Sequence, residues 1–200
     1  PCALRRAGAR QAGEHEMTSD PEILPLFDEA SIADRVAEMA REIAADRPER
    51  LLVVAVLKGS FMFAADLVRA LHRAGLELEM EFIHLSSYGA GTESREIRVL
   101  RDVESDVAGR DVILVDDILE SGRTLTFARD RLTQRGARSV RVAALLDKPS
   151  RRKSAISAEY VGFECPDRFV VGYGMDMGHK WRQLPFIGHV VQETAADADA

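Results

Sequence analysis

Residues 112–125 read Val112-Ile-Leu-Val-Asp-Asp-Ile-Leu-Glu-Ser-Gly-Arg-Thr-Leu125, and this stretch decides the fold. A short apolar run over 111–115 is followed by two adjacent acids, a Ser-Gly-Arg-Thr turn and the start of a helical pattern near Thr124. Continuous apolar runs of this kind are typical of strands that are buried on both faces, as in a parallel sheet. The stretch therefore predicts a strand, a tight turn and a helix in direct succession.

The same alternation of strands and helices extends along the chain. Apolar residues at helical spacing predict helices over 28–45, 61–74 and 124–135, the first of them capped by Ser31. The alternation favours an α/β fold with an open, mostly parallel sheet flanked by helices. In such sheets ligands bind beyond the carboxyl ends of the strands, so the residues at these ends are the first functional candidates. The predicted strands cover residues 51–57, 79–85, 97–100, 111–115, 140–146, 160–163 and 169–171.

Composition limits the class of protein. The chain has 200 residues, 46% of them hydrophobic and 30% charged, which is ordinary for one globular domain. The formal net charge of −6 argues against nucleic acid or an anionic membrane surface as a partner. No apolar run approaches the roughly 18 residues that a membrane span requires. We expect neither nucleic acid nor membrane among its partners.

The cysteines and the ends of the chain lead to further expectations. Cys2 and Cys165 form no CxxC pair and no disulfide framework, which fits a reducing compartment, and we expect the cytoplasm. The chain begins with Pro1, and its first methionine is Met17. We expect residues 1–16 to be a leader or an added upstream segment without ordered structure, 17–191 to form the domain and 192–200 to be a frayed tail.

The turn after the central strand has the chemistry of a phosphate site. A helix that begins at a glycine presents free N–H groups and its positive dipole end, and Ser121 and Thr124 add hydroxyl donors around Gly122. Asp116 and Asp117 would repel a bare phosphate, but they are useful if they hold ribose hydroxyls or Mg²⁺. The pattern therefore favours a ribose phosphate and lacks the Walker A spacing. A solvated acidic turn would explain the Asp pair alone, but not the whole stretch.

Three further strand ends carry candidate binding residues. Lys58-Gly59 joins a cation to an unhindered backbone, which suits a pyrophosphate, although a surface turn is the commoner role of such a pair. Lys148 ends another strand and could donate to an exocyclic oxygen, or could simply flank a turn. Phe169 could stack on a base, although core packing is the default for an aromatic residue in a strand.

Together these segments resemble the type I phosphoribosyltransferases, and among them the bacterial-type hypoxanthine (hypoxanthine-guanine) phosphoribosyltransferases. The resemblance covers residues 22–191 and implies the fold of that family, with a small hood built from the N- and C-terminal segments. The signature lies in 115–125, and the supporting stretches are 56–61, 86–89, 145–149, 161–164, 166–174, Asp176, Arg182 and 184–188.

The resemblance implies an enzyme of purine salvage. The reaction transfers the 5-phosphoribosyl group from phosphoribosyl pyrophosphate to N9 of hypoxanthine, and of guanine, and gives IMP or GMP and pyrophosphate. Mg²⁺ is the implied cofactor, and a homodimer or homotetramer is the implied assembly. The order of preference among hypoxanthine, guanine and xanthine stays open.

The resemblance also implies a role for individual residues, with Glu120 as the catalytic base near purine N7. The implied phosphoribosyl and 5′-phosphate site is Asp116, Asp117, Ser121, Gly122, Arg123, Thr124 and Leu125. The implied pyrophosphate site is Leu57, Lys58, Gly59 and Arg182, with a cis bond between Leu57 and Lys58. The implied purine site is Lys148, Phe169, Val170 and Asp176. The implied metal ligands are Asp116, Asp117 and Asp176. The implied lid, which would keep water from the anomeric carbon, carries Ser87 and Tyr88.

The sequence departs from the family pattern at three places, and rival interpretations stay open. Glu120 stands where many relatives carry aspartate, 92–96 is one residue shorter than many bacterial lids, and 177–180 replaces a stretch usually richer in tyrosine and acids. The rivals are a xanthine- or pyrimidine-preferring relative, a phosphoribosyl pyrophosphate sensor that binds nucleic acid, and a plain phosphate-binding module. The last of these leaves Lys148 and Phe169 unexplained.

Overall fold

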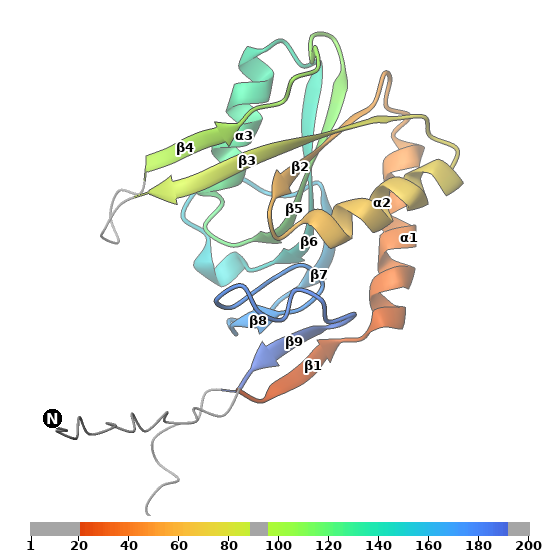
Figure 1. Ribbon diagram of the computed structural model, residues 1–200. Helices are drawn as coiled ribbons and strands as arrows, with labels where there is room; N and C mark the ends of the chain where they lie inside the picture. Colours follow the sequence, from red (N-terminus) through yellow and green to blue (C-terminus); the bar gives the residue numbers. More distant parts are fainter. Residues whose placement is uncertain (1–20, 89–95, 192–200) are drawn as a thin grey trace, which may run out of the picture.

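A six-stranded sheet forms the centre of the molecule, with strand order β4-β3-β2-β5-β6-β7 (Figure 1). The computed structural model describes residues 21–88 and 96–191, so the expectations for 1–16, for 192–200 and for the lid segment 92–96 lie wholly or almost wholly outside the described residues. β2, β3, β5, β6 and β7 run parallel, and β4 alone pairs antiparallel, with β3. The mostly parallel α/β sheet is thereby confirmed. The strands are β2 (Leu52–Leu57), β3 (Glu79–Tyr88), β4 (Glu96–Arg101), β5 (Asp111–Leu119), β6 (Ser139–Asp147) and β7 (Tyr160–Glu164).

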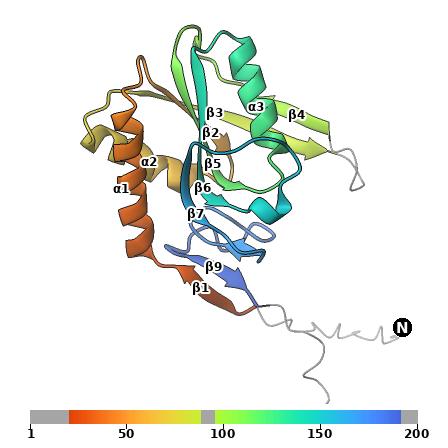
Figure 2. The same ribbon diagram turned by 180° about the vertical axis from the view of Figure 1, so that it is seen from behind.

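Three helices cover the two faces of this sheet. α1 (Glu29–Ala45) and α2 (Phe61–Arg73) pack on one face, and α3 (Arg123–Gln134) packs on the other (Figures 1 and 2). Each helix has one apolar stripe that is buried against the sheet, as the periodicity predicts. None of the helices in the described ranges has the length and apolar character that a membrane crossing requires.

β2 shows why the chain needs continuous apolar runs. Successive side chains of a strand point to opposite faces of the sheet. Val53 and Ala55 accordingly join the core beneath α1 and α2, whereas Leu52 and Val54 join the core beneath α3. All four are fully buried, because both faces of the central strand are covered. Positions 52–55 therefore offer no place at which a polar side chain would reach water.

A second, three-stranded antiparallel sheet forms the hood, and it joins the two ends of the described chain (Figure 2). Its order is β1 (Ile23–Phe27), β9 (Ile187–Val190) and β8 (Val170–Val171). The small hood built from N- and C-terminal segments is thus confirmed. β1 and β9 are not predicted from the sequence, since both are short and carry residues that disfavour strands, Pro25 and Gly188.

Two local expectations were wrong. Asp28, not Ser31, is the N-cap of α1, because its carboxylate accepts the backbone N–H of Ser31 at 2.8 Å. β5 does not end at Val115 but runs through the acid pair to Leu119. The reason is that its backbone stays paired with β6 to the end of that strand, where Leu119 lies opposite Asp147.

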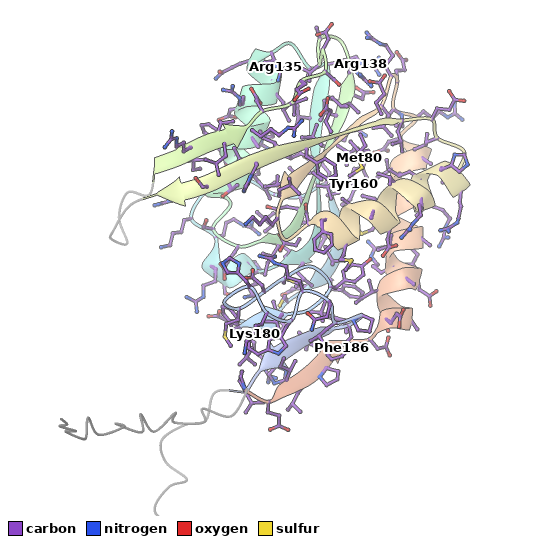
Figure 3. The ribbon with its side chains drawn as sticks, in the orientation of Figure 1. Met80, Arg135, Arg138, Tyr160, Lys180 and Phe186 are labelled. Atoms are coloured by element: carbon purple, nitrogen blue, oxygen red, sulfur yellow. The ribbon has the colours of Figure 1, made fainter. Side chains whose placement is uncertain are left out.

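The amino ends of the strands carry charged side chains that are paired with one another. Arg138 donates to Asp111 from its Nε at 2.9 Å and also contacts Glu49. The Arg138 guanidinium holds the pKa of Asp111 well below its usual range. Figure 3 shows Phe186 and Lys180 near the hood and Arg138 at the opposite end of the molecule. The charged side chains at this end pair with one another and stabilise the fold, so the candidate site lies at the carboxyl ends of the strands.

The core predicts a contrast between two leucines. Leu114 is fully buried in β5, so Leu114→Ala should lower the free energy of unfolding by about 2–5 kcal/mol. Leu100 is 52% exposed in β4, so Leu100→Ala should change it by less than about 0.5 kcal/mol. Urea unfolding followed by circular dichroism measures both variants. Equal losses would contradict the placement of β5 at the centre.

Candidate active site

The carboxyl ends of β2, β5 and β6 meet the hood at one cleft. Two cavities, of about 290 and 400 Å³, adjoin there, and Lys58, Gly59, Asp117 and Glu120 line both of them. Because the cavities share these residues, they form two halves of a single cleft. The first half extends along the turn after β5, and the second extends under the hood.

The first half is built by the end of β5 and the start of α3. Gly122 is the N-cap of α3 and has a φ of 79°, a left-handed conformation that glycine adopts without strain. The first N–H groups of a helix have no acceptor within the helix, so this turn offers donors to an anion. Arg123 is exposed and lines neither half. The predicted phosphoribosyl-site residues that line this half are Asp116, Asp117, Ser121, Gly122, Thr124 and Leu125.

The two adjacent acids are a concentrated and poorly solvated source of negative charge. Burial raises the pKa of Asp116, and the neighbouring Asp117 charge raises it further. Burial also raises the pKa of Asp117. The Asp117 carboxylate lies directly against Gly59, since a Cβ added to that glycine would be 1.8 Å from Asp117 Oδ2. A glycine is therefore required at position 59 for the carboxylate to take this place.

The acid pair is suited to a magnesium ion that is shared with a ligand. Within residues 21–88 and 96–191, no three Asp, Glu, His or Cys side chains gather closely enough to hold a metal by themselves. Mg²⁺ is usually bound through one or two carboxylates together with phosphate oxygens and water. One buried and one half-buried carboxylate with raised pKa values, beside a turn that offers phosphate donors, fit that kind of site.

The turn between β2 and α2 forms the floor between the two halves. The peptide bond from Leu57 to Lys58 is cis, as the family resemblance implies. The buried hydroxyl of Ser60 donates to the Val56 carbonyl at 2.6 Å and fixes the turn from within. Lys58 and Gly59 line both cavities, so a cation and an open backbone lie side by side in the cleft.

A loop over residues 172–182 covers this turn from the hood side. Arg182 donates to the Gly174 carbonyl at 2.6 Å and pairs with an Asp176 carboxylate oxygen at 2.6 Å. The Tyr173 hydroxyl donates to Asp66 of α2. The pKa of Tyr173 is raised mainly by burial and also by this hydrogen bond. The loop is therefore fixed internally and also to the helix that follows the Lys58 turn.

The second half of the cleft joins a buried cation to an exposed aromatic ring. Lys148 Nζ donates to the Arg168 carbonyl at 2.7 Å and lies 3.4 Å from Glu120 Oε1. The Lys148 side chain is only 6% exposed, whereas the Phe169 residue is 49% exposed although it is large and apolar. This half is suited to a flat heterocycle that carries a hydrogen-bond acceptor on its edge.

The structure brings almost all the predicted site residues into this cleft, while their roles stay predictions. Leu57, Lys148, Phe169, Val170 and Arg182 line it together with the residues described above. The exceptions are Arg123, which is exposed and lines neither half, and Ser87 and Tyr88, whose side chains lie outside the described part of the structure. Several further lining residues were not predicted, most of them within β2, β3 and β5 near their carboxyl ends; His84, in the second predicted strand, is the one that the strand-end rule could have found. The missed residues are Val56, His84, Leu85, Ile118, Leu119 and Met175.

Comparisons with known proteins agree with this geometry. The family model described as "Phosphoribosyl transferase domain" matches residues 25–177. The chain is 42% identical over 170 residues to the hypoxanthine phosphoribosyltransferase of Escherichia coli strain K12, which covers 83% of this chain and 94% of that protein. It is 43% identical over 173 residues to the corresponding protein of Haemophilus influenzae, covering 84% of this chain and 95% of the relative. A solved hypoxanthine-guanine phosphoribosyltransferase from Bacillus anthracis has 44% identity and a TM-score of 0.80 and covers 85% of this chain and 100% of its own.

The loop over 172–182 predicts a contrast between two of its glycines. Gly178 has a φ of 59° and open space around it, so Gly178→Ala should cost about 1–2 kcal/mol of stability, the usual cost of a left-handed residue. Gly174 has a φ of 102°, and a Cβ there would lie 2.1 Å from the Gly59 carbonyl oxygen. Gly174→Ala should therefore cost about 1–3 kcal/mol more from overpacking, measured by urea unfolding. Equal costs would mean that the loop does not press on the Lys58 turn.

Proposed function

Since the chain belongs to the phosphoribosyl transferase family, we propose that it is a purine-salvage enzyme that transfers the 5-phosphoribosyl group of phosphoribosyl pyrophosphate to N9 of hypoxanthine, and of guanine. The products are IMP or GMP and pyrophosphate. One observation carries the proposal. The phosphate-type turn at Gly122, the Lys58 turn and the Lys148–Phe169 pair open into a single cleft. A phosphorylated sugar and a flat base can therefore meet there.

The second half of the cleft supports recognition of a 6-oxopurine. The Lys148 ammonium has three protons. It donates one to the Arg168 carbonyl and one to the Glu120 carboxylate, which leaves the third for an oxygen on the base. An exocyclic amino group offers no comparable acceptor, so this contact favours oxo over amino purines. Stacking of the base on Phe169 would add about 1–3 kcal/mol. A plain phosphate-binding module would need neither residue.

The first half supports binding of the sugar donor. The turn over 121–124 would hold the 5′-phosphate, and Lys58 and Arg182 would contact the pyrophosphate. Asp116 and Asp117 would hold Mg²⁺ and the ribose hydroxyls, and Asp176 would contact a second ion. When bound, Mg²⁺ supplies positive charge that neutralises the leaving pyrophosphate. The chain itself orients the donor, since the donor's anionic groups meet fixed N–H groups and cations on both sides of the ribose.

Glu120 is proposed as the general base at purine N7. It lines both halves of the cleft, so its carboxylate lies between the sugar site and the base site. Proximity to the transferred proton matters more than an extreme pKa for such a base. As the purine loses its N7 proton to Glu120, its N9 attacks the anomeric carbon. The bond to pyrophosphate breaks, and positive charge develops on the ribose in the transition state. Ser87 and Tyr88 are proposed for a lid that excludes water during this step.

The proposed function also concerns the substrates, the assembly and the cellular location of the enzyme. Its substrates are small molecules. We propose a homodimer or homotetramer, by analogy with the relatives. We also propose a cytoplasmic location, because Cys165 is a free thiol.

A panel of bases tests the proposed reaction. With phosphoribosyl pyrophosphate and Mg²⁺, hypoxanthine and guanine should be converted to nucleotides at least tenfold faster than adenine, which lacks the 6-oxo oxygen that accepts from Lys148, and than uracil, which lacks the ring that carries N7 and N9. The rate with xanthine, which shares the 6-oxo oxygen, ranks the three oxopurines. Chelation with EDTA should reduce all rates to background, and added Mg²⁺ should restore them. Chromatography of the nucleotide products measures each rate. A preference for uracil or xanthine, or full rates in EDTA, would contradict the proposal.

Variants of Glu120 test the proton transfer. Glu120→Gln keeps the shape of the side chain but removes its basicity, so kcat should fall by about 100-fold or more. The affinity for IMP, measured by calorimetry, should stay within about threefold, since a lost neutral hydrogen bond costs little. Glu120→Asp should retain more activity than Glu120→Gln. Glu77→Gln, at an exposed position on the connection after α2, is the matched control and should leave kcat unchanged. Normal turnover of Glu120→Gln would remove this residue from the role of base.

A further inference from the structure

The connection between β6 and β7 holds the phosphate-type turn from behind. The Ser154 hydroxyl donates to the Ser121 carbonyl at 3.1 Å, and the backbone N–H of Lys153 donates to the same carbonyl at 3.0 Å. Both donors come from a segment more than thirty residues further along the chain. Neither residue lines the cleft, so these contacts act on the side of the turn that faces away from the ligand.

The contact between the connection and the turn is close. A Cβ added to Gly122 would lie 2.3 Å from Ser154 Oγ and 2.5 Å from Ile156 Cγ2. The connection therefore occupies the space that a side chain at position 122 would need. Thr126 adds a third polar group, because its hydroxyl donates to the Gly122 carbonyl at 2.9 Å and lies 3.3 Å from Ser154 Oγ.

The direction of the Ser121 carbonyl fixes the direction of the next N–H. In a planar trans peptide the C=O and N–H bonds point to opposite sides. The Ser121 carbonyl points back toward Ser154, so the N–H of Gly122 points forward into the cleft. The Gly122 carbonyl is held in the same way by Thr126, and the N–H of Arg123 donates to Ser121 Oγ at 3.4 Å. The N–H of Gly122 is thus oriented before any ligand arrives.

We propose that Ser154 is a positioning residue for the 5′-phosphate site of this enzyme, acting through the Ser121 carbonyl. This inference rests on the proposed function, because the ligand at the turn is taken to be the phosphate of a ribose 5-phosphate. Ser154 makes no contact with substrate. Its effect is to preorganise the turn, so its loss should weaken ligands that carry a 5′-phosphate and should spare those that lack one.

The test compares Ser154→Ala with the wild type. The KM for phosphoribosyl pyrophosphate and the dissociation constant of IMP should each rise by about two- to tenfold, as expected for one hydrogen bond. The KM for hypoxanthine and the affinity for inosine, which has no phosphate, should stay within twofold, and so should kcat at saturating donor. Ser154→Thr keeps the hydroxyl and should restore at least half of the lost donor affinity. Ser157→Ala, at an exposed serine of the same connection, is the matched control and should leave all values unchanged.

Each outcome decides the inference. An unchanged KM for the donor in Ser154→Ala contradicts it, and so does an equal rise for donor and hypoxanthine, which would indicate a general loss of structure. A Ser154→Thr variant as weak as Ser154→Ala would show that the hydroxyl is not the group that matters. If the wild type forms no nucleotide, the proposed function fails. Calorimetry with IMP and inosine then still tests Ser154, since it needs no turnover.

Discussion

The parallel ladder that joins β2, β5 and β6 is the constraint on which the site depends. These strands run side by side, so their carboxyl ends fall at one edge of the sheet. β5 keeps its pairing with β6 past its apolar part to Leu119. The ladder therefore carries Asp116 and Asp117 in rigid extended backbone, and only then releases the chain into the turn at Gly122. A strand that ended at Val115 would have left the acids on a loop.

Holding Asp116 and Asp117 side by side in rigid backbone is electrostatically unfavourable. Loss of hydration raises the pKa of both neighbouring carboxyl groups, and the charge of Asp117 raises the pKa of Asp116 further. Gly59 brings its backbone against one of them, and Arg182 offers positive charge from the other side. An isolated domain would gain stability from a less crowded arrangement. Carboxyl groups with pKa values raised in this way are typical of functional sites, where a bound ligand or ion supplies the compensating positive charge.

The sequence predicted the parts of the molecule that depend on local pattern. The apolar runs identified the strands of the central sheet, and the residues after those runs line the cleft, because parallel strands end together. It could not predict contacts between distant segments that have no local pattern. β9 becomes a strand by pairing with β1 on one side and β8 on the other, and the bond from Tyr173 to Asp66 joins residues 107 positions apart. The capping of α1 by Asp28 was missed because Ser31 offers an equally plausible local signal.

Two contacts between distant residues hold segments that face the cleft, and in each the holding residue does not itself line the cleft. They explain why the local pattern was enough to find the site but not to describe how it is held. Ser154 holds the Ser121 carbonyl, and Asp66 holds Tyr173 and with it the loop that bears Arg182. A binding group keeps useful geometry only when its own support is fixed. The residues that contact ligand follow from chemistry at the strand ends, whereas the residues that aim them follow from the topology that folds the chain back upon itself.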